Sequence, residues 1–277
     1  MSTKYQYETV KIEVSAEGIA HFQLNRPKKL NAFNDELIAD FRNAFREINR
    51  DSNVSVVVVS GSGRMFTAGL DLTEASITKM QGENEDAARK AYRNREHIED
   101  FQDAFTAIEL CPKPVIAAVH SACFGAGVDL ITACDIRYCT KDSFFCVKEV
   151  DVGLAADVGS LQRLPKVIGN QSLVRELCFT GRNMYAEEAL QAGLVSKVLE
   201  NQEAVLAEAF KIARDIASKS PVAIVGTKHL LNYSRDHTVA EGLAYTVTWN
   251  APMLNTEDIP KSIQAFVSKK PATYSKL

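Results

Sequence analysis

The sequence lacks several features that would assign it to a common class of protein. Its six cysteines include no C-x-x-C pair and no nearby histidine pattern, so no zinc site is predicted. They are typical of small core residues in a reducing compartment. No apolar stretch approaches the roughly 18 residues that a membrane-spanning helix needs. The amino end has neither an apolar run nor an arginine, so it resembles neither a signal peptide nor a transit peptide.

A strong charge of either sign is also missing. The formal net charge is −3 and the pI is near 6.0, so nucleic acid and anionic membrane surfaces are not the expected partners. What the chain does have is 277 residues, of which 46% are hydrophobic. That is enough for a substantial core, so we expect a soluble globular protein.

Hydrophobic patterning predicts an α/β fold. Alternating residues over 7–14 and 19–24 predict a hairpin, and uniformly apolar runs over 54–60 and 115–119 predict buried parallel strands. A helix through about residue 49 is expected between them, capped by Asn31 or Asn34. Helices dominate the later chain, and we expect an α/β core over residues 1–195 and a helical region over 196–277.

Two glycine-rich turns follow buried strands, one over residues 61–72 and one over 121–127. Neither has the lysine of a P-loop or the spacing of a dinucleotide fingerprint. Glycine there would let the backbone approach a ligand closely. Backbone N–H groups from two separate turns can form an oxyanion hole, which stabilises an enolate as well as a tetrahedral intermediate.

Three acids lie in apolar surroundings close after the second turn. Asp129 is expected in the first turn of a helix, Glu149 in an apolar, strand-like run, and Asp157 at the end of a loop of small residues. Such acids beside an oxyanion hole suggest proton transfer. Simpler interpretations stay open, because the helix dipole alone favours Asp129 and a strand glutamate commonly faces water.

The chain resembles the enoyl-CoA hydratase/isomerase (crotonase) family over nearly its whole length. The matching marks are Asn25-Arg26-Pro27, the loop from Phe66 to Leu72, and Gly125-Ala126-Gly127. Within the family, the run KEVDVGLAADVGSLQRLPKVIGNQSLV is most similar to the Δ3,5-Δ2,4-dienoyl-CoA isomerases. One departure is visible, since the family commonly has glycine at the position of Ala126.

The resemblance implies a crotonase-like ββα spiral core with a C-terminal helical region that forms trimers, which pair into hexamers. It implies no metal and no cofactor beyond the coenzyme A of the substrate. The Leu70 and Ala126 amides would form the oxyanion hole. The implied substrate contacts are Ala68, Gly69, Leu70, Asp71, Leu72 and Ala126. For Asp71, a purely structural role as a loop hydrogen bonder stays open.

The implied reaction converts 3,5-dienoyl-CoA to 2,4-dienoyl-CoA in the β-oxidation of unsaturated fatty acids. The three catalytic acids would be Asp129, Glu149 and Asp157. We assign Asp157 to the C2 proton and Glu149 to C6, with Asp129 raising the pKa of Glu149. Enoyl-CoA hydration stays open, because Asp129 and Glu149 fall where hydratases carry two glutamates.

Two further expectations concern partners. A few relatives of the family bind RNA, but the basic residues Lys90, Arg93 and Arg95 alternate with acids, so the sequence disfavours that role. The tripeptide Ser275-Lys276-Leu277 matches the peroxisomal address that an import receptor reads. It predicts a peroxisomal location.

Overall fold

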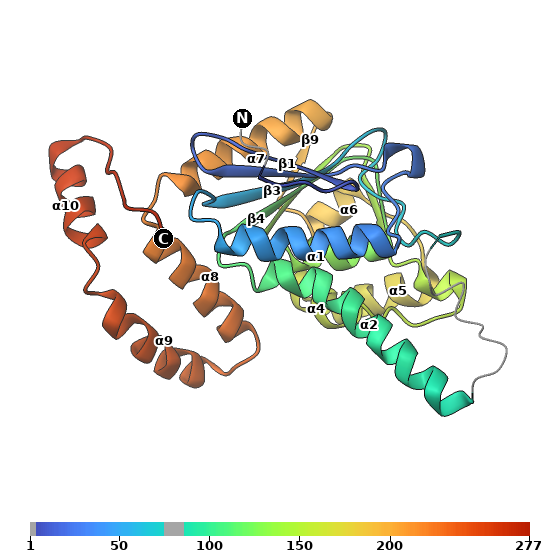
Figure 1. Cartoon of the computed structure of the whole chain (residues 1–277). Coiled ribbons are helices and arrows are strands. Elements are labelled where there is room, and N and C mark those ends of the chain that lie inside the picture. Colours follow the sequence, from blue (N-terminus) through green and yellow to red (C-terminus); the bar gives the residue numbers. More distant parts are fainter. Residues whose placement is uncertain (1–3, 75–85) are drawn as a thin grey trace.

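A six-stranded sheet organises the chain, which the computed structural model describes over residues 4–74 and 86–277 (Figure 1). The strand order is β1-β2-β3-β4-β6-β9, with β1 and β2 antiparallel and the other pairs parallel. The strands are β1 Val10–Val14, β2 Ile19–Leu24, β3 Val56–Gly61, β4 Val115–Val119, β6 Ile136–Thr140 and β9 Lys197–Leu199. The predicted hairpin and both predicted buried strands are therefore confirmed.

Both faces of this sheet are covered, which explains why β3 and β4 are apolar throughout. On one face pack α1 (Asp35–Arg50) and α2 (Ala87–Glu109), with the aromatic cluster Phe22, Phe33, Phe41, Phe45, Phe101 and Phe105 at the contact. On the other face, α7 (Gln202–Ala217) buries Val205, Ala209 and Ala213. The cap of α1 is Asn34, whose side chain accepts from the Leu37 amide.

A second, smaller sheet lies beside the first, and the segment that carries Glu149 follows its strand β7 (Phe144–Cys146). The other strands of this sheet are β5 Ala122–Phe124 and β8 Met184–Tyr185, and the order is β5-β7-β8. Two short helices pack on it, α3 (Ala126–Ala133) on β5 and α6 (Ala186–Gln191) on β7 and β8; α4 (Ser160–Ile168) packs on α3, and α5 (Gln171–Thr180) packs on α4. The α3 helix starts directly after β5 and is buried along its whole length.

The last three helices are α8 Pro221–Arg235, α9 Val239–Met253 and α10 Asp258–Ser268. Of these, α9 and α10 extend away from the core (Figure 1), whereas α8 is joined to it by buried Lys228, which donates to Ile108 O and Lys113 O and pairs with Asp135. Stacked rings, Tyr233 on Tyr245 and His229 on Trp249, join α8 to α9. Apolar side chains nevertheless face outward from α9 and α10, with Val239 80% exposed and Phe266 87% exposed. The described helices include none long and apolar enough to cross a membrane.

Two expectations need comment. Glu149 is not in a strand: β7 ends at Cys146, and Glu149 begins a short 3-10 helix, η3 (Glu149–Val152). The apolar run was misleading because the chain leaves the small sheet after only three strand residues. The boundary at residue 195 remains a prediction, although β9 and α7, which follow it, pack into the main sheet and against it.

Candidate active site

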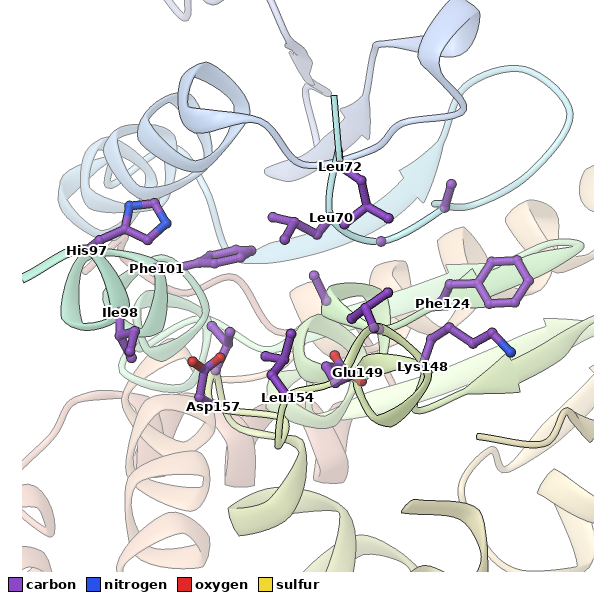
Figure 2. A pocket seen from close by; sticks show the side chains of 16 residues that line it. Leu70, Leu72, His97, Ile98, Phe101, Phe124, Lys148, Glu149, Leu154 and Asp157 are labelled. Atoms are coloured by element: carbon purple, nitrogen blue, oxygen red, sulfur yellow. The ribbon is translucent and has the colours of Figure 1, made fainter. Parts of the chain in front are cut away.

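One cavity brings the two glycine-rich turns and two of the acids together (Figure 2). Leu70, Leu72 and Phe101 face Glu149, Leu154 and Asp157 across it. We call residues 68–72 and 124–126 the amide wall, and residues 149–157 the acid wall. The full lining is Ala68, Gly69, Leu70, Leu72, His97, Ile98, Phe101, Phe124, Gly125, Ala126, Lys148, Glu149, Val152, Leu154, Asp157 and Val158.

The first half of the amide wall is held from behind by Phe33. The Phe33 amide donates to Gly69 O at 2.7 Å, and the Asp71 amide donates to Phe33 O at 2.8 Å. Leu70 lies between these two bonds, and no described residue accepts from its N–H. Asn31 orders the preceding turn, since its amide nitrogen donates to the carbonyls of Ser62, Met65 and Phe66. The Leu70 amide is therefore available to a ligand.

The second half of the amide wall is joined to the first through Thr67. Its amide donates to Ala122 O at 3.1 Å, and its carbonyl accepts from the Phe124 amide at 3.2 Å. A Cβ on Gly127 would lie 2.4 Å from Thr67 Cγ2, so only glycine permits this approach. In the described chain no group accepts from the Ala126 amide, at the first turn of α3. Ala126 has no positive φ, so alanine is tolerated there.

Glu149 lies next to this second amide. A Cβ placed on Gly125 would be 3.1 Å from Glu149 Oε1, so the carboxyl group occupies the space beside the start of α3. Its other oxygen, Oε2, is buried and has no hydrogen-bond partner in the described chain. Burial raises the pKa of Glu149, and the nearby charge of Asp157 raises it further.

Asp157 lies farther along the same wall, where the cavity is lined by Ile98 and Phe101 of α2 (Figure 2). Its side chain is half-buried, and burial raises its pKa. His97, also from α2, opposes this shift electrostatically. The two acids therefore border different parts of one cavity.

Asp129 does not line the cavity. It is 0% exposed on α3, and its Oδ1 accepts the backbone N–H of Ser160, the first residue of α4. Its Oδ2 has no partner among the described residues. Burial, and next the charge of Glu149, raise its pKa to about 7. A direct contact between Asp129 and a substrate in the cavity is therefore not supported, because the carboxyl group is covered and engaged at a helix N-terminus.

Asp71 is also absent from the cavity lining, and its expected substrate contact stays a prediction. Its carboxylate accepts hydrogen bonds from Arg26, from the Thr73 hydroxyl and from the amides of Thr73 and Glu74. Burial opposes these bonds, yet together they lower its pKa. The alternative structural role is the one that the geometry supports, because every oxygen is used to hold the loop after Leu70.

Sequence reasoning missed the contribution of α2 to the site. Ile98, Phe101 and His97, which line the cavity from α2, are not among the residues that the sequence predicted for the site. The α2 helix is distant in sequence from both glycine-rich turns. Its own sequence therefore does not indicate that one of its faces closes the cavity. No arrangement of His, Cys, Asp and Glu suited to a metal ion occurs within residues 4–74 and 86–277.

Comparison with known proteins identifies the family of the chain. Residues 15–276 match the enoyl-CoA hydratase/isomerase family. The chain belongs to this family. It is 54% identical to the mitochondrial Delta(3,5)-Delta(2,4)-dienoyl-CoA isomerase of Mus musculus, over 99% of this chain and 84% of that one. It is 41% identical to the peroxisomal isomerase of the same name from Arabidopsis thaliana, over 99% of this chain and 100% of that one.

Solved structures of the family share the fold. The enoyl-CoA hydratase of Bacillus anthracis superimposes with a TM-score of 0.87 at 28% identity, covering 96% of this chain and 99% of that chain. The expected crotonase-like fold is confirmed, as is the resemblance to the dienoyl-CoA isomerases.

Proposed function

We propose that the protein isomerises 3,5-dienoyl-CoA to 2,4-dienoyl-CoA in the β-oxidation of unsaturated fatty acids. The observation that carries the proposal is that Glu149 and Asp157 border one apolar cavity opposite the amide wall. The identity with proteins named as dienoyl-CoA isomerases supports this reaction over hydration. No cofactor is needed, because the reaction only moves a proton and two double bonds.

In the proposed mechanism the thioester oxygen accepts hydrogen bonds from the Leu70 and Ala126 amides. Negative charge grows on that oxygen when the C2 proton leaves, so donors aimed there lower the barrier. The apolar lining from Leu70, Phe101 and Leu154 offers few partners to a bound water molecule, which favours proton delivery to C6 over addition of water.

The geometry favours the opposite order of the two acids from the one expected. Glu149 lies beside Gly125 and therefore close to the Ala126 amide, whereas Asp157 lies at the α2 end. C2 is bonded to the thioester carbon, so we assign Glu149 to removal of the C2 proton. The dienolate then takes a proton at C6 from Asp157. Glu149 gains one proton and Asp157 loses one, and exchange with solvent resets both.

The electrostatics suit these roles. A base must be ionised and an acid protonated in the same cavity, and raised pKa values bring both groups nearer to a neutral working pH. Neutral Asp129 behind Glu149 would avoid placing a second negative charge beside the ionised base. Its raised pKa of about 7 is consistent with that state.

A direct test compares 3,5-octadienoyl-CoA with crotonyl-CoA. We expect the first substrate to produce a dienoyl chromophore conjugated with the thioester, with little hydration of the second. Loss of the enoyl chromophore of crotonyl-CoA, without conversion of the dienoyl substrate, would identify a hydratase instead.

We further propose that the protein forms hexamers from paired trimers. The supporting observation is the apolar surface of α9 and α10, which includes Leu243, Val247, Ile263, Phe266 and Val267. Surface of this kind marks a protein interface when it is contiguous. Sedimentation of the wild type and of Phe266→Asp tests this proposal, and a monomeric wild type would contradict it.

A peroxisomal location is our last proposal for this protein. It rests on Ser275-Lys276-Leu277, whose residues are exposed, and on the peroxisomal name of the Arabidopsis relative. The relatives from mammals are named as mitochondrial. Imaging a fluorescent fusion with and without the tripeptide distinguishes the two locations.

A further inference from the structure

Few interactions hold the carboxyl group of Asp157, the acid that we assign to C6. Apart from its own amide, no described residue donates a hydrogen bond to the Asp157 carboxyl group, and it forms no ion pair. Its side chain is also only half-buried. The direction of this carboxyl group therefore depends on the backbone that carries it, between η3 and α4.

That backbone is held by side chains from three helices. Gln102 of α2 donates from Nε2 to Asp157 O at 2.6 Å. Arg163 of α4 places Nη1 3.5 Å from Val158 O. Asp129 of α3 accepts the Ser160 amide. Main-chain atoms of residues 157, 158 and 160 thus each contact a side chain of a different helix.

The arginine is itself held rigidly. Arg163 Nε donates to Glu109 Oε2 at 2.7 Å, and Nη2 donates to Thr106 Oγ1 at 3.1 Å, both on α2. Its side chain is 12% exposed. Gly159 has φ 140°, and a Cβ there would lie 2.0 Å from Arg163 Nη1. Glycine at this position therefore serves both the backbone turn and the placement of the guanidinium.

We infer that Gln102 and Arg163 are positioning residues for proton transfer by Asp157. They act through the backbone and touch neither the substrate nor the reacting atoms. The inference rests on the proposed isomerase function and adds to it the groups that aim the second acid. Misplacement of a catalytic group by about 1 Å can cost a factor of 10² in rate, so a backbone clamp of this kind is worth measuring.

The partition of the dienolate provides a readout that a merely structural role would not change. In deuterated water, Glu149 removes the C2 proton and the dienolate forms. The dienolate then either takes a deuteron at C2, which gives back labelled substrate, or is protonated at C6, which gives product. If the Asp157 carboxyl group is less well positioned, only protonation at C6 becomes slower. The ratio of C2 deuterium in recovered substrate to product formed should therefore rise.

The main variant is Gln102→Met, which keeps the length of the side chain and removes its donor. Gln102 is exposed, so the protein should fold normally. We expect kcat to fall roughly tenfold, KM to change by less than about twofold, and the exchange ratio to rise roughly tenfold. Gln102→Lys restores a donor of sufficient reach and should recover most of the wild-type ratio.

Arg163→Met should shift the ratio in the same direction, and circular dichroism tests its folding. The matched control is Lys166→Met. Lys166 is on the same helix as Arg163 and lines a surface groove together with Gln102 and Arg163, but among the described residues it pairs only with Asp236. That variant should keep the wild-type ratio.

The outcomes separate the two proposals. Product formation by the wild type, combined with an unchanged ratio in both Gln102→Met and Arg163→Met, overturns the positioning role alone. Equal loss of exchange and isomerisation in these variants overturns it as well, because that pattern reports general damage. A wild type that forms no 2,4-dienoyl product overturns the proposed function, and the positioning role with it.

Discussion

The amide wall and the acid wall of the cavity are built in different ways. The amide wall presents main-chain N–H groups of Leu70 and Ala126, and hydrogen bonds between backbone atoms hold both turns in place. The acid wall presents side chains of Glu149 and Asp157, carried by a 3-10 helix and a loop. The function of the amide wall depends on the backbone conformation of its turns. The function of the acid wall depends on the identity of its side chains.

Because of this difference, members of the family can share the oxyanion hole and still differ in their catalytic carboxyl groups. A backbone amide is supplied by any residue except proline, so an oxyanion hole survives substitution as long as the turns keep their shape. Ala126 illustrates this, since no group in the described part of the chain accepts from its amide although the residue is alanine. Carboxyl groups have no such tolerance, because removing one removes a proton donor or acceptor. We therefore expect the acid wall to decide which reaction occurs.

The largest expected effect is in Glu149→Gln. Without a base at C2 no dienolate forms, so isomerisation and deuterium exchange at C2 should both fall by about 10³-fold or more. Stopped assays in deuterated water measure both rates on one sample. Persisting exchange at C2 would show that another group is the base.

Asp157→Asn should block only the second transfer. Isomerisation should fall by about 10³-fold, while exchange at C2 continues and the affinity for an acyl-CoA product stays close to that of the wild type. Binding can be followed by calorimetry. Weak binding together with normal residual turnover would contradict the assignment.

The buried acid behind the wall should make the stability of the protein depend on pH. The pKa of Asp129 is raised to about 7 in the folded protein, above its unfolded value, so the folded state binds this proton more tightly. Its contribution to stability is therefore complete below about pH 4 and is lost as pH rises through 7, on the order of a few kcal/mol.

Asp129→Asn removes that titration, and its side-chain oxygen still accepts the Ser160 amide. Urea unfolding between pH 5 and pH 8 should show the wild type losing stability with rising pH relative to the variant. Parallel curves for the two proteins would mean that Asp129 does not titrate in this range.

The amide wall should be broken by a single methyl group at Gly127. In Gly127→Ala the new Cβ would lie 2.4 Å from Thr67 Cγ2 and 2.9 Å from Cys123 Sγ, so the two turns must separate. We expect a loss of about 1–3 kcal/mol in stability, with weaker substrate binding as well as slower turnover. Thermal unfolding and KM test this, and an unchanged KM would show that the turns adapt.

The smallest effect should come from Ala126→Gly. The amide is kept. Because Ala126 does not have a positive φ, glycine would relieve no backbone strain there. Turnover should stay within about threefold of the wild type, with a slight loss of stability because glycine is more flexible at the start of a helix. A large drop in kcat would mean that the alanine methyl group itself shapes the site.

Local signals were sufficient for much of the fold and part of the site. Uniformly apolar runs identified β3 and β4, and Asn34 was one of two expected caps for α1. The same reasoning failed at Glu149, where an apolar run continues past the end of β7 into a 3-10 turn. Chain periodicity cannot report where a neighbouring strand ends, and in the small sheet β8 has only two residues.

By itself the sequence determined the residue types: two glycine-rich turns, the acids near them, and apolar segments long enough to form a sheet buried on both faces. The tertiary structure alone decided which amides are left without an acceptor, and that Asp129 is buried behind the site at the start of α4. It also placed Glu149 beside Ala126 and the face of α2 opposite Leu154. Hydrogen-bond pairing and burial depend on segments far apart in the chain, and these settle only when the helices and both sheets pack together.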